Sequence, residues 1–387
     1  MKKIYYLGCM LGTLFSLAVM TNTVQAAPPA QKTPTITQVL DASGVKVSGF
    51  IDGSATYNWN GTPNFTSGTS SRAYDVQPNS FNIQMLELAI SKEPTRGFGG
   101  KVVLNAGPDA NVDASYGTSN TDGFDIQQGY VSYQANGAKL EVGKFATLIG
   151  AEVIESPDNW NFSRAWGFEL GPYTHTGARL SYAPTDKVSV TVGVNNGWDV
   201  LKAAITQKSF EGQITYSPIT PVYLSVQATY GMEAAQGNYG TAGTIYAERA
   251  LYNTVDRWDI NDTLSLMLDA GYGTQKHAIS LAPGATGLAQ TVKWWYVTPY
   301  LNYHFTKQWR VALRAQYFDD KDGFRTGVAQ KLKAGTITLA YMPNDHAEVR
   351  AEYRYDKSNV KGFVTIRGGR LPSYHQSSAA LEFIYKM

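Results

Sequence analysis

Cysteine is almost absent from this chain. Cys9 is the only one among 387 residues, and it lies inside the apolar N-terminal stretch rather than directly after it. A lipidated cysteine would follow such a stretch, so we do not expect lipid attachment at Cys9. The rest of the chain has no thiol for a disulfide framework, a thiolate nucleophile or a cysteine metal site.

Long apolar runs and an excess of positive charge are also missing. After the N-terminal stretch, no apolar run approaches the roughly 20 residues that a membrane-spanning helix needs. The chain carries 33 Lys and Arg and 31 Asp and Glu; without residues 1–26, the counts are 31 and 31. A balanced charge gives no reason to expect a nucleic acid as a partner.

The first residues have the form of an export signal. Lys2 and Lys3 precede an apolar stretch from Ile4 to Met20, and Val24 and Ala26 are small residues of the kind a signal peptidase needs. We therefore expect a cleaved signal peptide at 1–26. The alternative is a single N-terminal membrane anchor.

What the chain does contain is alternation with a period of two residues. In 187–195, four valines lie on one face and polar residues on the other, and 45–59, 263–273 and 346–355 repeat this pattern. Period two indicates strands with one apolar and one polar face. The valines are Val188, Val190, Val192 and Val194, and the polar residues opposite them are Lys187, Ser189, Thr191 and Asn195.

Short and long connections alternate between these strands. Short turns fall near residues 93–95, 136–137, 184–186, 218–220, 261–262, 306–308 and 343–345. Long polar loops occupy 60–78, 107–122, 146–172, 195–207, 233–243, 274–290, 319–330 and 356–374. This asymmetry predicts an all-β fold: a transmembrane antiparallel up-and-down β-barrel of about 16 strands, with short periplasmic turns and long extracellular loops. The barrel is expected over 45–387, after a short periplasmic segment at 27–44.

Tyrosines near the turns support a location in the bacterial outer membrane. Tyr182, Tyr216 and Tyr341 each precede a proline turn, as an aromatic girdle at the membrane interface requires. Ordinary corners of a soluble β-sandwich are the alternative. The last strand alternates Leu381, Phe383, Tyr385 and Met387, with methionine where such barrels usually end in an aromatic residue. We expect outer-membrane lipid and the barrel-assembly machinery as partners.

Several segments resemble the OmpL-like family of β-barrel porins of bacterial outer membranes. They are 79–94, 143–180, 317–327 and 352–359, of which 143–180 is the most specific, and the likeness extends from about Val45 to the C-terminus. The resemblance implies a porin-type barrel, a water-filled channel for passive diffusion of small hydrophilic solutes. It brings no assigned solute and no functional residues.

The loop at 146–172 is the candidate constriction. It carries charged residues and four aromatic residues that could anchor it to the wall: Glu152, Glu155, Asp158 and Arg164, with Trp160, Phe162, Trp166 and Phe168. We favour a loop folded into the lumen over a loop folded across the mouth.

Four arginines are expected on the inner wall: Arg310, Arg314, Arg350 and Arg354, the last two interleaved with Glu348 and Glu352. Two interpretations stay open. The arginines could face the loop acids and create a field across the constriction, or they could pair with acids along the wall as a solvated ladder.

Enzyme motifs are lacking. The five histidines, at 175, 277, 304, 346 and 375, have no metal-ligand spacing, and no GxSxG elbow occurs. We therefore expect no enzyme activity, no metal and no cofactor. A barrel enzyme built from loop residues, for instance Glu152 with Asp158, and a plugged structural or adhesive barrel are the alternatives. The solute, the ion selectivity and any homo-oligomer are not determined by the sequence.

Overall fold

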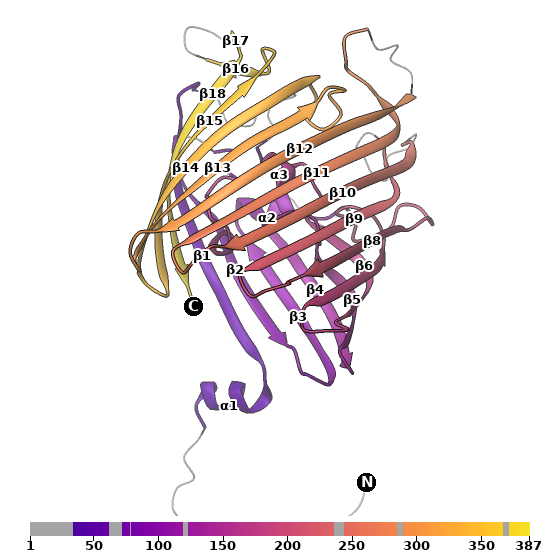
Figure 1. Ribbon diagram of the computed structural model, residues 1–387, viewed down its shortest axis with the longest axis vertical. Helices are drawn as coiled ribbons and strands as arrows, with labels where there is room; N and C mark the ends of the chain where they lie inside the picture. The colour runs from indigo at the N-terminus through magenta and orange to yellow at the C-terminus, as the bar shows by residue number, and fades with distance from the viewer. Residues whose placement is uncertain are drawn as a thin grey trace, which may run out of the picture.

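The computed structural model describes residues 34–61, 72–77, 79–118, 123–235, 244–284, 289–366 and 371–387. The expected signal peptide at 1–26 lies outside the described residues. Within the described part, 34–44 include a short helix that the sequence did not predict, α1 (Ile36–Ser43), which is capped by Thr35 and Gly44. It lies below the barrel wall, beyond the start of the first strand (Figure 1).

Sixteen antiparallel strands close into a barrel, in agreement with the predicted count. Neighbours in sequence are neighbours in the sheet, and β1 closes the barrel by pairing with β18. The strands are β1 (Lys46–Asn58), β2 (Ser80–Lys92), β3 (Gly97–Ala106), β4 (Phe124–Ala135), β5 (Ala138–Ala146), β6 (Thr174–Tyr182), β7 (Val188–Asn195), β8 (Ser209–Tyr216), β9 (Val222–Ala234), β10 (Tyr246–Asp259), β11 (Leu264–Ile279), β12 (Ala289–His304), β13 (Trp309–Asp320), β14 (Gln330–Asn344), β15 (Ala347–Ser358) and β18 (His375–Lys386).

The connections differ between the two ends of the barrel, as predicted. One end has tight turns, such as Asn136–Gly137, where both residues have a positive φ, 52° and 77°, as a two-residue hairpin requires. The other end carries the long loops, including the small sheet of β16 (Phe363–Thr365) and β17 (Leu371–Ser373) near the top of Figure 1. We refer to the turn end and the loop end.

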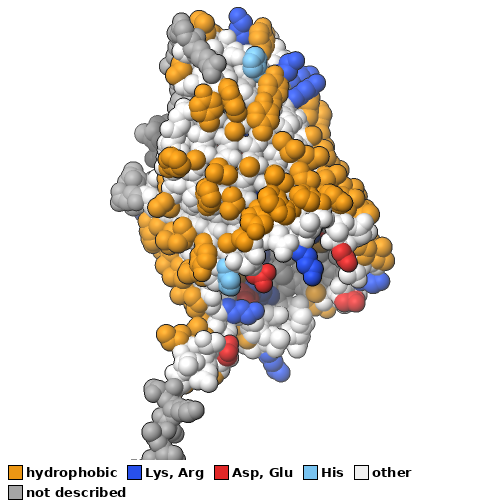
Figure 2. Space-filling view, turned by 90° about the vertical axis from the view of Figure 1, so that its left-hand side faces the viewer, with side chains coloured by type: hydrophobic (Ala, Val, Ile, Leu, Met, Phe, Trp, Pro, Cys, Tyr) orange, Lys and Arg blue, Asp and Glu red, His pale blue; other side chains and the backbone are white. Residues whose placement is uncertain are grey.

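The inside–outside assignment of the side chains also agrees with the alternation. Val192 is 53% exposed on the outer face, whereas its neighbour Thr191 is 6% exposed and faces inward. Figure 2 shows hydrophobic side chains spread over the outer face, with charged side chains gathered toward the two ends. An apolar outer belt over a polar interior is the pattern that a barrel in lipid requires. Among the described residues, no helix is long and apolar enough to cross a membrane.

Three of the long connections fold into the barrel. Residues 72–77 belong to the first of these connections, and α2 (Pro108–Asp113) belongs to the second. The third, residues 147–173, connects β5 to β6 and is called the inner loop below. It contains η1 (Ser156–Asp158) and α3 (Trp166–Glu169). Apolar side chains of all three share one cluster with inward residues of the wall. The members of that cluster are Phe50, Tyr74, Met85, Ile154, Phe168, Tyr173 and Ile384, with Ala73 and Val112 packed against it.

Candidate functional site

The inner loop is bonded to the wall by charged and polar side chains. Glu152 forms an ion pair with Arg314, with 2.7 Å between Oε1 and Nη1. Glu352 accepts hydrogen bonds from the backbone N–H groups of Phe162, at 2.8 Å, and Ser163, at 3.0 Å. These contacts join residues far apart in sequence and hold the loop against β13 and β15.

The four predicted arginines all contribute to this anchoring. Each donates a hydrogen bond to a backbone carbonyl oxygen of the inner loop, and each is at most 5% exposed. The bonds run from Arg310 to Trp160 (2.8 Å), from Arg314 to Ser163, from Arg350 to Ser156 (3.1 Å) and from Arg354 to Arg164 (2.6 Å). The arginines lie on the inner wall, as the alternation predicted, but beneath the loop.

Acidic side chains of the same wall complete the network. The ion pairs are Arg310–Glu348 (2.6 Å), Arg350–Glu348 (2.7 Å), Arg350–Glu382 (3.2 Å) and Arg354–Asp356 (2.8 Å). We call these four arginines and Glu348, Glu352, Asp356 and Glu382 the arginine wall. Pairing along the wall was one of the two interpretations of the sequence, but here the pairs are buried and not solvated. A field across a constriction stays a prediction.

The predicted loop charges have separate environments. Glu152 is the one that meets a predicted arginine, whereas Glu155 accepts a hydrogen bond from Nε2 of Gln127 at 3.1 Å. Asp158 is exposed. Arg164 is buried and donates to the backbone oxygens of the loop itself, at residues 153, 154 and 162. Arg164 therefore stabilises the fold of the loop. Glu152 and Asp158 are not paired by any contact among the described residues.

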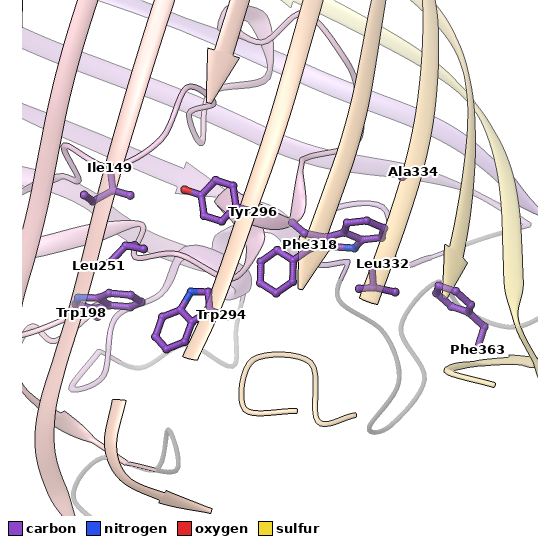
Figure 3. Close-up of a cluster of buried hydrophobic side chains, with 10 residues drawn as sticks. Ile149, Trp198, Leu251, Trp294, Tyr296, Phe318, Leu332, Ala334 and Phe363 are labelled. Atoms are coloured by element: carbon purple, nitrogen blue, oxygen red, sulfur yellow. The ribbon is translucent and has the colours of Figure 1, made fainter. Parts of the chain in front are cut away.

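Aromatic side chains of the loop occupy the interior as the sequence suggested. Trp166 joins a buried cluster toward the loop end of the barrel, and Phe168 belongs to the cluster shared with the other inward connections. Figure 3 shows the labelled members of the first cluster as a row along one part of the wall, from Trp198 to Phe363. Its members are Ile149, Trp166, Trp198, Leu251, Trp294, Tyr296, Phe318, Leu332, Ala334 and Phe363.

One buried carboxyl of the loop has no hydrogen-bond partner among the described residues. Both oxygens of Glu169, in α3, are unbonded although the side chain is 8% exposed. Burial raises the pKa of the Glu169 carboxyl to about 8, and the nearby Arg354, Arg72 and Arg314 oppose that rise. Burial of the Glu169 carboxyl therefore favours its protonated form.

The inner loop leaves a cavity of about 540 Å³ against β8, β9, β10 and β11, a part of the wall that carries none of the four predicted arginines; we call it the side cavity. Its lining is mostly uncharged: Leu148, Gly150, Ala151, Gln213, Tyr223, Ser225, Gln227, Val255, Arg257, Asp259 and Met267. No prediction from the sequence anticipated this cavity. The available signal was the Ser, Thr and Gln residues at alternate positions of 213–215 and 225–229, which carry no charge.

In the described ranges, no group of three or more His, Cys, Asp or Glu is arranged to hold a metal ion.

Comparison with known proteins identifies a family. The model of the family described as "Putative beta-barrel porin-2, OmpL-like" matches residues 44–387. No curated protein matches the sequence significantly.

Solved structures share the fold at low sequence identity. The outer-membrane channel DcaP of Acinetobacter baumannii has a TM-score of 0.59 at 16% identity, over 89% of this chain and 97% of that one. OmpT of Vibrio cholerae, described as an outer-membrane protein in a trimer form, gives 0.60 at 11% identity, over 89% and 99%. An anion-selective porin from Comamonas acidovorans gives 0.58 at 12% identity, over 89% and 99%.

Proposed function

The chain belongs to the OmpL-like β-barrel porin family and is a porin of the bacterial outer membrane, and on that premise we propose that small hydrophilic solutes cross it between the inner loop and the β8–β11 side of the wall. The observation that carries this proposal is the side cavity, which lies against strands other than those of the arginine wall. The loop covers the arginines and leaves this side open, so the least obstructed route runs along it.

Charge along this route is balanced. Arg257 and Asp259 line the side cavity and form an ion pair with 2.9 Å between Nε and Oδ1. Asp158 is the exposed acid of the loop, whereas Glu152 is paired and Glu155 is half-buried. We expect a mild, salt-dependent ion selectivity to which Asp158 contributes more than the covered arginines.

Further parts of the proposal follow from the sequence. Residues 1–26 direct export and are removed, and 27–44 form a short periplasmic segment before the barrel. Lipid and the barrel-assembly machinery are its partners during insertion. The trimer form named for OmpT supports a homo-oligomer here as well. We propose a channel and not an enzyme, because the matching family is one of porins and solved structures of similar fold include a channel and a porin.

A plugged barrel is the competing candidate, and a specific observation favours it. The hydrophobic cluster from Trp198 to Phe363 joins residues of the inner loop to the wall toward the loop end and fills part of the interior (Figure 3). Conductance of the purified protein in a planar bilayer separates the two functions. Discrete open-channel steps support a porin, and their absence in folded protein supports a plug.

The route itself can be tested with single cysteines, because the only natural cysteine is Cys9. A thiol reagent that adds a bulky group to Gln213→Cys should lower the conductance, since Gln213 lines the side cavity. Ile214→Cys, whose side chain is 56% exposed on the outer face, is the matched control and should be unaffected. A current that is unchanged by modification of Gln213→Cys would place the route elsewhere.

A further inference from the structure

The side cavity has the chemistry of a binding site for an uncharged, hydroxyl-rich molecule. We propose that it binds neutral saccharides of one or two rings, weakly and reversibly, as they pass through the channel. This inference rests on the proposed route. The volume of about 540 Å³ lies within the range of about 300–1,000 Å³ that is usual for small-molecule sites.

Uncharged polar side chains form two parallel rows on this side of the wall. Strand register places Ser181, Thr191, Gln213 and Gln227 side by side in one row. It places Ser189, Thr215 and Ser225 in the next. We call these seven residues the hydroxyl wall. Hydroxyl and amide groups both donate and accept hydrogen bonds, as sugar hydroxyls do, so one surface can satisfy several sugar hydroxyls in different orientations.

Gln227 supplies a specific unsatisfied acceptor. Its Nε2 donates to Oγ of Ser225 at 2.5 Å, which fixes the amide, and Ser225 donates in turn to the carbonyl oxygen of Val255 at 3.2 Å. Oε1 of Gln227 has no partner among the described residues, although the side chain is 2% exposed. A buried acceptor without a partner is unfavourable, and since Oε1 is closed off from solvent in this conformation, the amide must turn toward the cavity before a solute hydroxyl can donate to it.

Aromatic rings provide the second contact that a sugar needs. A sugar ring carries hydroxyls around its edge and C–H groups on its faces, and the apolar faces pack on aromatic rings. Tyr223 lines the cavity and is 37% exposed. Trp160 of the inner loop is half-buried, and its ring is held edge-on to Tyr300 with 6.3 Å between centroids. Arg257 lies over the same indole ring, at 5.7 Å, and so joins Trp160 to the cavity lining.

The site offers little to a charged solute. The side chains of Arg257 and Asp259 pair with each other. The backbone N–H groups of Gly150 and Ala151, which would otherwise suit an anion, already donate to Asn253 at 3.0 Å and Asp269 at 3.3 Å. A charged solute would meet Arg257 and Asp259 only as a pair of opposite charges, 45% and 42% exposed, whereas a neutral polyol would exchange water hydrogen bonds for equivalent ones.

The test measures ion current through the purified full-length porin in a planar bilayer while solutes are added. The probes are sucrose, polyethylene glycol of the same hydrodynamic radius, and gluconate as a polyhydroxy anion. Sucrose should reduce the open-channel current saturably, whereas polyethylene glycol should reduce it only as much as it reduces bulk conductivity. Gluconate should carry part of the current as an anion and should not block the open channel saturably.

Variants locate the site. Gln227→Leu should raise the half-blocking concentration of sucrose about tenfold, the effect of losing one hydrogen bond. Gln213→Leu is the second variant if Gln227→Leu fails to fold. Gln134→Leu, a half-buried inward glutamine of β4 that does not line the cavity, is the matched control and should leave the block unchanged.

The possible outcomes of these measurements separate a failure of the saccharide site from a failure of the porin proposal. If sucrose acts like polyethylene glycol, or if the Gln227 and Gln134 variants respond alike, the saccharide site is wrong while the porin proposal stands. If gluconate blocks at lower concentration than sucrose, the cavity is an anion site. If the folded protein gives no conductance, the proposed diffusion route itself fails, and the saccharide site fails with it.

Discussion

Two sides of one barrel interior use polar residues in different ways. The arginine wall carries full charges, yet its arginines are at most 5% exposed, because the inner loop covers them and accepts their hydrogen bonds. The hydroxyl wall has no full charge among its seven residues, and its side is the one left open as the side cavity. In this barrel the charged side holds the inner loop in place, and the uncharged side lines the route that we propose for solutes.

The free energies of ion pairs and of neutral hydrogen bonds explain why the charged side holds the loop and the uncharged side lines the route. Charges withdrawn from water must be paired well, and removal of one partner of a buried ion pair costs about 3–5 kcal/mol. A neutral hydrogen bond contributes only about 0.5–1.5 kcal/mol. Strong contacts therefore suit a loop that must stay in place. Weak, exchangeable contacts suit a surface that solutes must leave again.

The largest effect is expected when the anchor is broken. Arg314→Met leaves the Glu152 carboxylate buried without its partner, and we expect a loss of about 3–5 kcal/mol in stability. The temperature at which the folded gel band converts to the unfolded one measures it. Thr215→Val on the hydroxyl wall should cost about 0.5–1.5 kcal/mol. The comparison is contradicted if Arg314→Met lowers the conversion temperature no more than Thr215→Val does. It is also contradicted if adding Glu152→Gln to Arg314→Met restores none of the lost stability.

The second largest loss in stability is expected from a charge placed on the outer face. Val192→Arg puts a cation into hydrocarbon and should cost about 2–4 kcal/mol near the membrane midplane, so little folded barrel should form. Thr191→Arg puts the same charge on the inner face of the hydroxyl wall and should be tolerated. Heat-modifiable gel mobility reports both. Equal loss in the two variants would mean that the assignment of inner and outer faces is wrong.

A pH effect of about 1–2 kcal/mol is expected from Glu169. Its pKa is raised to about 8 when folded, so the folded state holds a proton that the unfolded state releases near its ordinary pKa. Stability is then complete at low pH and declines as the pH rises through about 8. The full shift is discounted because an ionised Glu169 can turn toward the nearby arginines. Melting temperatures at pH 5 and 8 measure the decline, which Glu169→Gln should abolish; a decline that persists in Glu169→Gln has another source.

The smallest effect concerns ion selectivity. Asp158→Asn should shift the zero-current potential in a salt gradient toward anion preference, because Asp158 is the exposed acid of the inner loop. Arg310→Gln should shift it less, since Arg310 is covered by the loop and paired with Glu348. A larger shift from Arg310→Gln would mean that the arginine wall faces the conducting path after all. The field across the constriction would then be the better interpretation.

Some of the site could be predicted from the sequence. The inward positions of Arg310 and Arg354 follow from alternation, and the inner loop stands out by its length and its aromatic residues. Which half of the interior the loop covers did not follow. The contact between Phe162 and Glu352 spans 190 residues, and no local pattern encodes such a pairing. The side cavity was missed for the same reason, since its lining comes from the loop and from β8 to β11.

Strands, turns and the two faces of the wall were determined by the sequence itself. The contrast between Val192 and Thr191 and the turn at Asn136–Gly137 depend only on neighbours along the chain, because the side-chain period and the turn dihedrals are local properties. Only the tertiary structure decided that the arginines hold the loop and that Gln213, Ser225 and Gln227 of the hydroxyl wall line the cavity. Once the barrel closes, all inward side chains must pack into the same limited volume. Which of them contact one another depends on segments that are far apart in the sequence.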